Sequence, residues 1–200
     1  MNKFFISLIF MTIIFLSCSE TVPVPKPPTH LKLDLPSHSY DKLTLDVPYS
    51  FELPQFYKAK SIANRNDSNK IQNSLIIDLG PLNGKLFLYF KNLIEGDTLA
   101  RYINFANDKV DDHKIKASKI LQQNIINLDK SVYGTFFELQ GDVATNFQFY
   151  LTDSVSQFAR GEIILNCKPN YDSLIPSLNY IKQNLMHLIN TFEWNNIDNE

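Results

Sequence analysis

The sequence predicts an α+β fold, in which a largely antiparallel sheet is packed by a long C-terminal helix and a middle helix. Aromatic residues make up 12% of the chain, with 15 Phe and 9 Tyr, and this composition favours strands. Short segments in the second half alternate between apolar and polar residues, as half-buried strands do. Apolar residues near the C-terminus instead recur every three or four positions, which is the spacing of one helix face.

The first half of the chain contains four segments whose patterns predict strands: residues 31–35, 49–53, 75–79 and 85–90. Pro36 follows the first segment and places it at a sheet edge, because proline cannot donate a ladder hydrogen bond. The last two segments flank Gly80–Gly84 and therefore predict a hairpin with a longer loop. Asn64–Asn69 is a polar run and predicts a loop.

A middle helix is predicted from Thr98 to about His113, with Asp97 as its N-cap. Its apolar residues share one face, which consists of Leu99, Tyr102, Ile103, Ala106 and Val110. The next segment, Ile115–Leu128, is rich in Asn and Gln and is compatible with either a second helix or a strand.

Three further strands are predicted at residues 131–139, 146–152 and 159–167. Short turns join them into a meander, and Gly141-Asp142 forms the first turn. In the middle strand, apolar side chains occupy one face and polar side chains the other, so only one face is expected to be buried. Cys167 shares the apolar face of the last strand and is expected to be a buried, inert thiol.

A long helix is predicted to follow Pro169-Asn170, with Asp172 as its cap and Pro176 in its first turn. Trp194 is expected to hold the end of the chain against the core, and residues 195–200 form a polar tail. The apolar stripe of the helix is expected to pack on the sheet and consists of Leu174, Leu178, Ile181, Leu185, Leu188 and Phe192.

The N-terminus predicts a lipoprotein signal peptide over residues 1–17. Its apolar run, Phe4–Leu16, is shorter than the roughly 20 residues that span a bilayer, but it has the length of a signal-peptide core. The small Ser17 precedes Cys18, whose thiol is expected to carry the lipid that holds the mature protein on a membrane.

Residues 18–30 contain four prolines and predict an extended, semi-rigid tether between the lipid and a single domain at residues 31–194. Ser19 stands where an Asp would retain a lipoprotein in the inner membrane, so we expect anchoring in the outer membrane. Glu20 stands alone instead of in the acidic cluster of some surface-exposed lipoproteins, and we therefore expect the protein to face the periplasm.

The formal net charge of −2 gives no reason to expect binding to nucleic acid or to an anionic lipid surface. The sequence lacks a Gly-x-Ser-x-Gly elbow, a phosphate-binding Gly-rich loop and a His-Glu-x-x-His pair, so we expect no enzyme activity, cofactor or metal. Asp111-Asp112-His113 predicts a charged helix end, because consecutive helical residues point about 100° apart and cannot share one ion. Cys167 and His187 are not expected to pair, because His187 lies on the polar side of the last helix.

One candidate interaction surface consists of Tyr150, Arg160 and Glu162, which fall on the polar faces of two neighbouring strands. On a free sheet face or edge they would present aromatic and charged anchors to a partner protein. The alternative is an ordinary solvated sheet face.

Seven motifs are spread in order along the chain: LDLP at residues 33–36, PYSFE at 48–52, IKA at 115–117, VYG at 132–134, NFQFYLTDS at 146–154, FARG at 158–161 and HLINTFEW at 187–194. Together they resemble the gliding-motility lipoprotein GldD family of Bacteroidetes. The resemblance implies a cell-envelope lipoprotein needed for gliding and for the type IX secretion system. It also implies partners among other gliding and secretion lipoproteins or envelope proteins, with no catalytic residues or cofactor.

Two functions follow as hypotheses. The first is a non-catalytic assembly or stability component of the gliding and secretion machinery, with no small-molecule substrate. The second is a periplasmic solute- or lipid-binding lipoprotein, which predicts a deep apolar pocket near Phe147 and Phe149. The meander followed by a helix is also similar to the sandwich of PsbP and Mog1-like proteins, a likeness of fold that says little about function.

Overall fold

The computed structural model describes residues 34–66, 70–93 and 97–195. The predicted signal peptide, Cys18, the tether and residues 196–200 of the predicted tail lie outside the described residues. Neither α-helix in the described part of the chain is long and apolar enough to cross a membrane.

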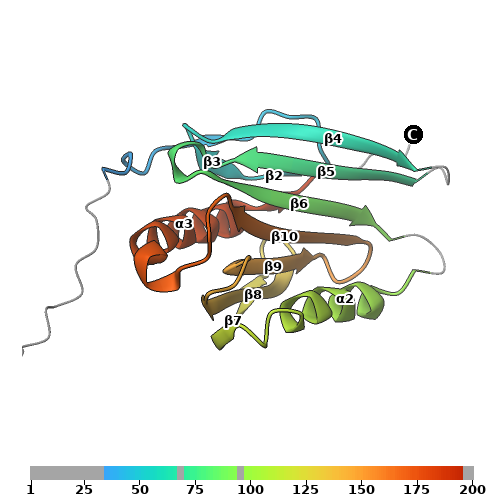
Figure 1. Ribbon diagram of the computed structural model, residues 1–200. Coiled ribbons are helices and arrows are strands. Elements are labelled where there is room, and N and C mark those ends of the chain that lie inside the picture. The colour runs from blue at the N-terminus through green and yellow to red at the C-terminus, as the bar shows by residue number, and fades with distance from the viewer. Residues whose placement is uncertain (1–33, 67–69, 94–96, 196–200) are drawn as a thin grey trace, which may run out of the picture. The chain divides into compact units, whose positions relative to one another are not determined.

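An antiparallel sheet of seven strands forms the centre of the described fold (Figure 1). Its strands are β4 (Lys58–Asn66), β5 (Lys70–Asp78), β6 (Gly84–Asn92), β7 (Ala117–Asn127), β8 (Val132–Gly141), β9 (Phe147–Thr152) and β10 (Gln157–Leu165). Their order across the sheet is β4-β5-β6-β10-β9-β8-β7, so two meanders join where β6 pairs with β10. The predicted hairpin and the predicted meander of the second half are both confirmed.

Two helices cover opposite faces of this sheet. The first, α2 (Leu99–Asp111), lies over β9 and β10, where Val110 packs with Phe137. The second, α3 (Tyr171–Thr191), shares a core with Phe136 on the other face, because neighbouring residues of a strand point to opposite sides. The structure therefore confirms the α+β fold with a middle and a long C-terminal helix.

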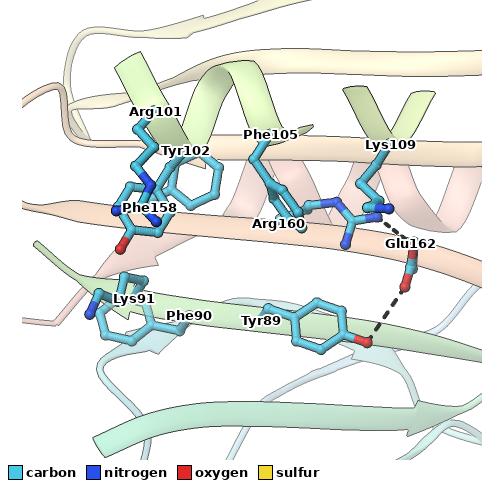
Figure 2. A pocket seen from close by; sticks show the side chains of 10 residues that line it. All are labelled: Tyr89, Phe90, Lys91, Arg101, Tyr102, Phe105, Lys109, Phe158, Arg160 and Glu162. Atoms are coloured by element: carbon cyan, nitrogen blue, oxygen red, sulfur yellow. Dashed lines mark hydrogen bonds and ion pairs between the residues drawn. The ribbon is translucent and has the colours of Figure 1, made fainter. Parts of the chain in front are cut away.

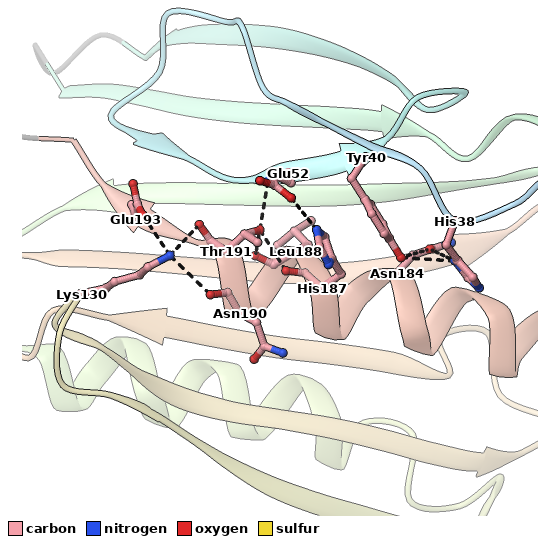
Figure 3. Close-up of polar contacts among 10 residues, drawn as sticks. All are labelled: His38, Tyr40, Glu52, Lys130, Asn184, His187, Leu188, Asn190, Thr191 and Glu193. Atoms are coloured by element: carbon pink, nitrogen blue, oxygen red, sulfur yellow. Dashed lines mark hydrogen bonds and ion pairs between the residues drawn. The ribbon is translucent and has the colours of Figure 1, made fainter.

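Residues 34–57 form an N-terminal strap that lies alongside α3 on the same face of the sheet (Figure 3). It contains β1 (Tyr40–Lys42), which pairs with β3 (Glu52–Pro54), and β2 (Tyr49–Ser50), which pairs with β11 (Glu193–Trp194) at the end of the chain. Because β2 and β11 are far apart in sequence, their pairing closes the domain by joining its first and last segments.

Polar contacts attach the strap to the side of α3 that the sequence predicts to face solvent (Figure 3). Tyr40 Oη donates to Asn184 Oδ1 at 3.0 Å, and His38 Nδ1 lies 2.9 Å from the same oxygen. His187 Nε2 lies 2.7 Å from Glu52 Oε2, and its ring stacks on Tyr40 with a centroid distance of 3.6 Å. Asn184 is consequently only 2% exposed, so α3 is covered on more than its apolar stripe.

The structure corrects three predictions in the first half of the chain. The described part of the predicted strand at 31–35 is irregular, and the first strand of the described chain is β1 instead. The predicted strand at 49–53 is divided at Phe51, because β2 and β3 pair with different strands. Asn64–Asn66 belong to β4 rather than to a loop, and residues 67–69 lie outside the described residues.

The segment Ile115–Leu128, which the sequence leaves open, forms strand β7 at one edge of the sheet. Its Asn and Gln side chains are mostly exposed, and Ile125 is the buried residue of the strand. An edge strand contacts the sheet on one side only, so a weak apolar pattern is sufficient to place it.

The helix caps also differ from the predictions. Thr98, not Asp97, is the N-cap of α2, and its side chain makes no capping hydrogen bond. Asn170, not Asp172, caps α3 by accepting a hydrogen bond from the backbone N–H of Ser173 at 3.3 Å. Because the helix starts at residue 171, Pro176 falls in its second turn instead of its first.

Two burial predictions were wrong. Cys167 is exposed and free, because β10 ends at Leu165 and the chain has left the sheet by residue 167. The polar face of β9 is buried as well as the apolar one, with Gln148 at 2% and Thr152 at 4% exposure, because α2 covers it.

The last described residues are held as predicted for Trp194. Trp194 packs edge-on against Phe192 at a centroid distance of 4.7 Å and donates its indole N–H to the Ser131 carbonyl at 3.1 Å. Asn195, assigned to the polar tail, donates to the Val47 carbonyl at 2.9 Å and is therefore attached to the strap. Lys130 lies at the C-terminus of α3, within 3.3 Å of the Thr191 carbonyl, where a cation complements the helix dipole (Figure 3).

Gly161 leaves room for Phe149, which it faces across the β9–β10 pair, and a Cβ at this position would overlap the ring. We expect Gly161→Ala to lower the free energy of unfolding by about 1–3 kcal/mol through overpacking. Chemical denaturation of the single variants Gly161→Ala and Phe149→Leu and of the double variant measures the coupling. The substitution at Gly161 should cost much less in the Phe149→Leu background; an equal cost in both backgrounds would contradict the packing explanation.

Asp153 closes the turn between β9 and β10 by accepting backbone N–H groups from Val155, Ser156 and Gln157 at 2.8–2.9 Å. Burial acts to raise the pKa of Asp153, but these hydrogen bonds outweigh it and lower the pKa below its ordinary value. A carboxyl with a lowered folded-state pKa contributes stability above its unfolded pKa of about 4, and this stability is lost as the pH falls through the folded pKa. Asp153→Asn should therefore reduce stability at pH 7, with a difference from the wild type that shrinks below about pH 4 in denaturation curves. A difference of equal size at pH 7 and pH 3 would sink this explanation.

Candidate functional site

A groove of about 500 Å³ lies between α2 and the strands β6 and β10, on the face of the sheet opposite α3 (Figure 2). Its lining combines aromatic and charged side chains and consists of Tyr89, Phe90, Lys91, Arg101, Tyr102, Phe105, Lys109, Phe158, Arg160 and Glu162. A volume of this size is within the range of ligand and side-chain binding sites.

Arg160 lies in the middle of the groove and is 7% exposed (Figure 2). Its Nη2 donates to Glu162 Oε2, which is next-but-one on the same strand, and to Gln148 Oε1 at 3.2 Å on β9. The guanidinium carbon lies 5.8 Å from the ring centroid of Tyr89 on β6 and 5.8 Å from that of Phe105 on α2. The arginine is thus held by two polar partners and two rings, and these contacts offset the cost of removing its charge from water.

One hydrogen-bond donor of Arg160 lacks a partner within the described residues. Its Nε is buried and has no hydrogen-bond acceptor among the described residues. A buried donor without a partner costs about 1–3 kcal/mol, and such groups in native proteins call for an explanation.

The other cations stand around the rim. Lys109 on α2 pairs with Asp112 at 2.9 Å and lies 5.6 Å from the Phe105 ring centroid. Lys91 on β6 pairs with Asp97 at 3.5 Å, and Arg101 is an exposed residue of the first helical turn. The groove therefore has an aromatic floor and a predominantly positive rim.

Two tyrosines of the groove are bound to carboxylates. Tyr89 Oη donates to Glu162 Oε1 at 3.5 Å, and Tyr102 Oη donates to Asp97 Oδ1 at 3.1 Å. Burial, and then the neighbouring Glu162 charge, raise the pKa of Tyr89; burial, and then the hydrogen bond to Asp97, raise that of Tyr102. Both phenols are therefore neutral donors at physiological pH.

The structure brings together two of the three residues of the predicted interaction surface. Arg160 and Glu162 line the groove, whereas Tyr150 is not among its lining residues. The Tyr150 ring stacks on Phe158 at a centroid distance of 5.9 Å, and its hydroxyl accepts a hydrogen bond from Thr135. The expectation of a free sheet face or edge was wrong, because β10 is central in the sheet and α2 covers part of this face. A role of these residues in partner binding stays a prediction.

Sequence reasoning missed the half of the groove that α2 supplies. Arg101, Phe105 and Lys109 recur every four residues and share one helix side, and this spacing is the signal that could have found them. The pocket predicted near Phe147 and Phe149 is not where the groove lies, because both rings are packed in the core beneath α3.

Within the described residues, no group of three or more His, Cys, Asp or Glu side chains could hold a metal ion. The charged helix end is used in ion pairs, because Asp111 pairs with Lys114 at 2.7 Å and Asp112 with Lys109. His187 on α3 contacts Glu52 and Tyr40 of the strap.

Comparison with known proteins identifies one family. A family model described as gliding motility lipoprotein GldD matches residues 20–194. No curated protein and no solved structure matches the chain significantly, so the likeness to PsbP and Mog1-like proteins stays a prediction. The matched range includes the entire described fold except Asn195, and with it every residue of the groove.

The pairing of Arg160 with Glu162 can be tested by denaturation. The two side chains are only 8% and 19% exposed, so Glu162→Gln leaves a buried positive charge without its partner and should cost about 3 kcal/mol of unfolding free energy. Adding Arg160→Met should recover most of that loss. The control is Asp111→Asn, which breaks an exposed ion pair at the C-terminal end of α2 and should cost less than about 0.5 kcal/mol. Similar costs for Glu162→Gln and Asp111→Asn would show that the buried pair does not stabilise the groove.

Proposed function

Because the chain belongs to the gliding motility lipoprotein GldD family, we propose that it is a non-catalytic assembly and stability component of the gliding machinery and of the type IX secretion system. The observation that carries the proposal is the family match over residues 20–194. As a gliding motility lipoprotein, the protein is membrane-anchored through lipid, and Cys18 is the residue that the sequence offers for the attachment.

A non-catalytic role is supported by the chemistry of the groove. Its central charge, Arg160, is already paired with Glu162 and held between two rings, which suits positioning and recognition better than proton transfer. The aromatic and arginine side chains of the groove are the residue types that dominate binding energy at protein interfaces. Anchoring in the outer membrane, with the domain in the periplasm, is part of the same proposal and rests on Ser19 and Glu20.

Deletion of the gene tests the role directly. The deletion strain should fail to spread on agar and should retain type IX substrates inside the cell, whereas general export of other periplasmic proteins should continue. Normal spreading and normal secretion in the deletion strain would refute the proposal.

Complementation with cysteine variants tests the anchor. Cys18→Ala should abolish incorporation of labelled palmitate, release the protein from the membrane fraction and fail to restore spreading. Cys167→Ala is the matched control, because this second cysteine is exposed and free and should tolerate substitution without loss of label or function. Label retained in Cys18→Ala would show that the lipid is attached elsewhere, and density separation of the labelled membranes reports which membrane holds the protein.

A further inference from the structure

The groove has an unusual balance of charges for a protein with a net charge of −2. Among the described residues, four cationic side chains line it, from Lys91, Arg101, Lys109 and Arg160, against the single carboxylate of Glu162. Asp97 and Asp112 stand beside it and pair with the two lysines, but Arg101 forms no ion pair with a carboxylate of the described residues. The charge of the rim, summed over the residues that the structure describes, therefore stays positive and favours an anionic occupant.

The apolar side of the groove is also incompletely covered. Phe105 is a large aromatic residue, yet it is 49% exposed where it projects from α2 over Arg160 (Figure 2). Tyr102 and Phe158 form a second aromatic surface beside it, with ring centroids 5.6 Å apart. Covering an exposed aromatic side chain is favourable by roughly 25 cal/mol for each Å² removed from water.

From these features we propose that the groove binds an acidic segment of a partner protein, with one carboxylate at Arg160, between the rim cations Arg101 and Lys109, and a neighbouring apolar side chain on Phe105 and Phe158. The inference rests on the proposed assembly role and names the chemistry of the partner. The buried Nε–H of Arg160 supports the proposal independently. It has no hydrogen-bond acceptor among the described residues, and a carboxylate of the partner would be such an acceptor. This donor is buried, so a side chain beside it turns aside as the carboxylate enters.

The occupant is a polypeptide segment rather than a small acid because the features to be covered are spread along the whole length of the groove. Lys109 is 43% exposed at one end of the helical rim, and Arg101 lies two helical turns away at the other. Positions eight residues apart on a helix are about 12 Å from each other, which an extended segment of about four residues spans. An organic acid too short to span this distance would leave one of the rim cations uncovered.

Site-directed photocrosslinking in intact cells tests the proposal with the full lipidated chain. The photoreactive amino acid p-benzoylphenylalanine replaces Phe105, and in a control strain it replaces Val155, an exposed apolar residue of the β9–β10 turn outside the groove. We expect an adduct at position 105 whose attached peptide, mapped by mass spectrometry, carries Asp or Glu close to the attachment point. A lipid or small-molecule adduct, a peptide without nearby acidic residues, or the same adduct at both positions would overturn the proposal, as would no adduct at position 105.

Charge reversal distinguishes recognition from proximity. Arg101→Glu combined with Lys109→Glu should reduce the adduct at position 105 about tenfold or more, and reversing the acidic residues of the mapped peptide to Lys should restore it. Lys114→Glu is the matched control: like Lys109 it pairs with an Asp three residues away on the same segment, but it lies outside the groove. Equal loss with Lys114→Glu, or no loss with the double reversal, refutes the groove inference. The assembly role fails separately, through normal spreading and secretion in the deletion strain.

Discussion

Strand β10 lies in the middle of the seven-stranded sheet, and both of its faces have to be covered. On one face, Gly161 leaves space for the ring of Phe149 beneath α3. On the other face, Arg160 and Glu162 are nearly buried and compensate each other. Because the side chains of β10 alternate between the two faces, this one strand contributes to the apolar core on one side and to the charged groove on the other. The positions of α2 and α3 depend on this alternation.

This arrangement explains how a groove with a buried charge stays ordered. Gln148 holds Arg160 from the neighbouring strand, and its own amide donates to the Lys109 carbonyl of α2 at 3.4 Å. The helix, β9 and β10 are therefore connected through one polar network beneath the aromatic surface. A recognition site built on rigid elements keeps its donors in place without a change in backbone, which lowers the ordering cost of binding.

The strap likewise connects separate elements, on the opposite face of the sheet. Its aromatic residues Tyr49 and Phe51 stack with Phe192, and its polar contacts bury the hydrophilic side of α3. The pairing of β2 with β11 joins the beginning of the described chain to its end. A segment that follows a predicted membrane tether is thus part of the core of the domain, and its attachment to α3 resists separation from the body.

The sequence by itself determined the class of the fold, the meander, the hairpin at Gly80–Gly84 and both helices, because period-two and period-3.6 patterns report which side of each element meets apolar neighbours. Its motifs also determined the family. It did not determine that Gln148 and Asn184 are buried, since a polar side chain signals solvent unless another element supplies its hydrogen-bond partners. Only the tertiary structure decided that α2 lies over β9 and β10, and this placement converted Arg160 and Glu162 from a presumed open face into one wall of a groove. The other wall comes from a helix more than 40 residues away in the chain, and the packing that joins the two walls has no local signature in the sequence.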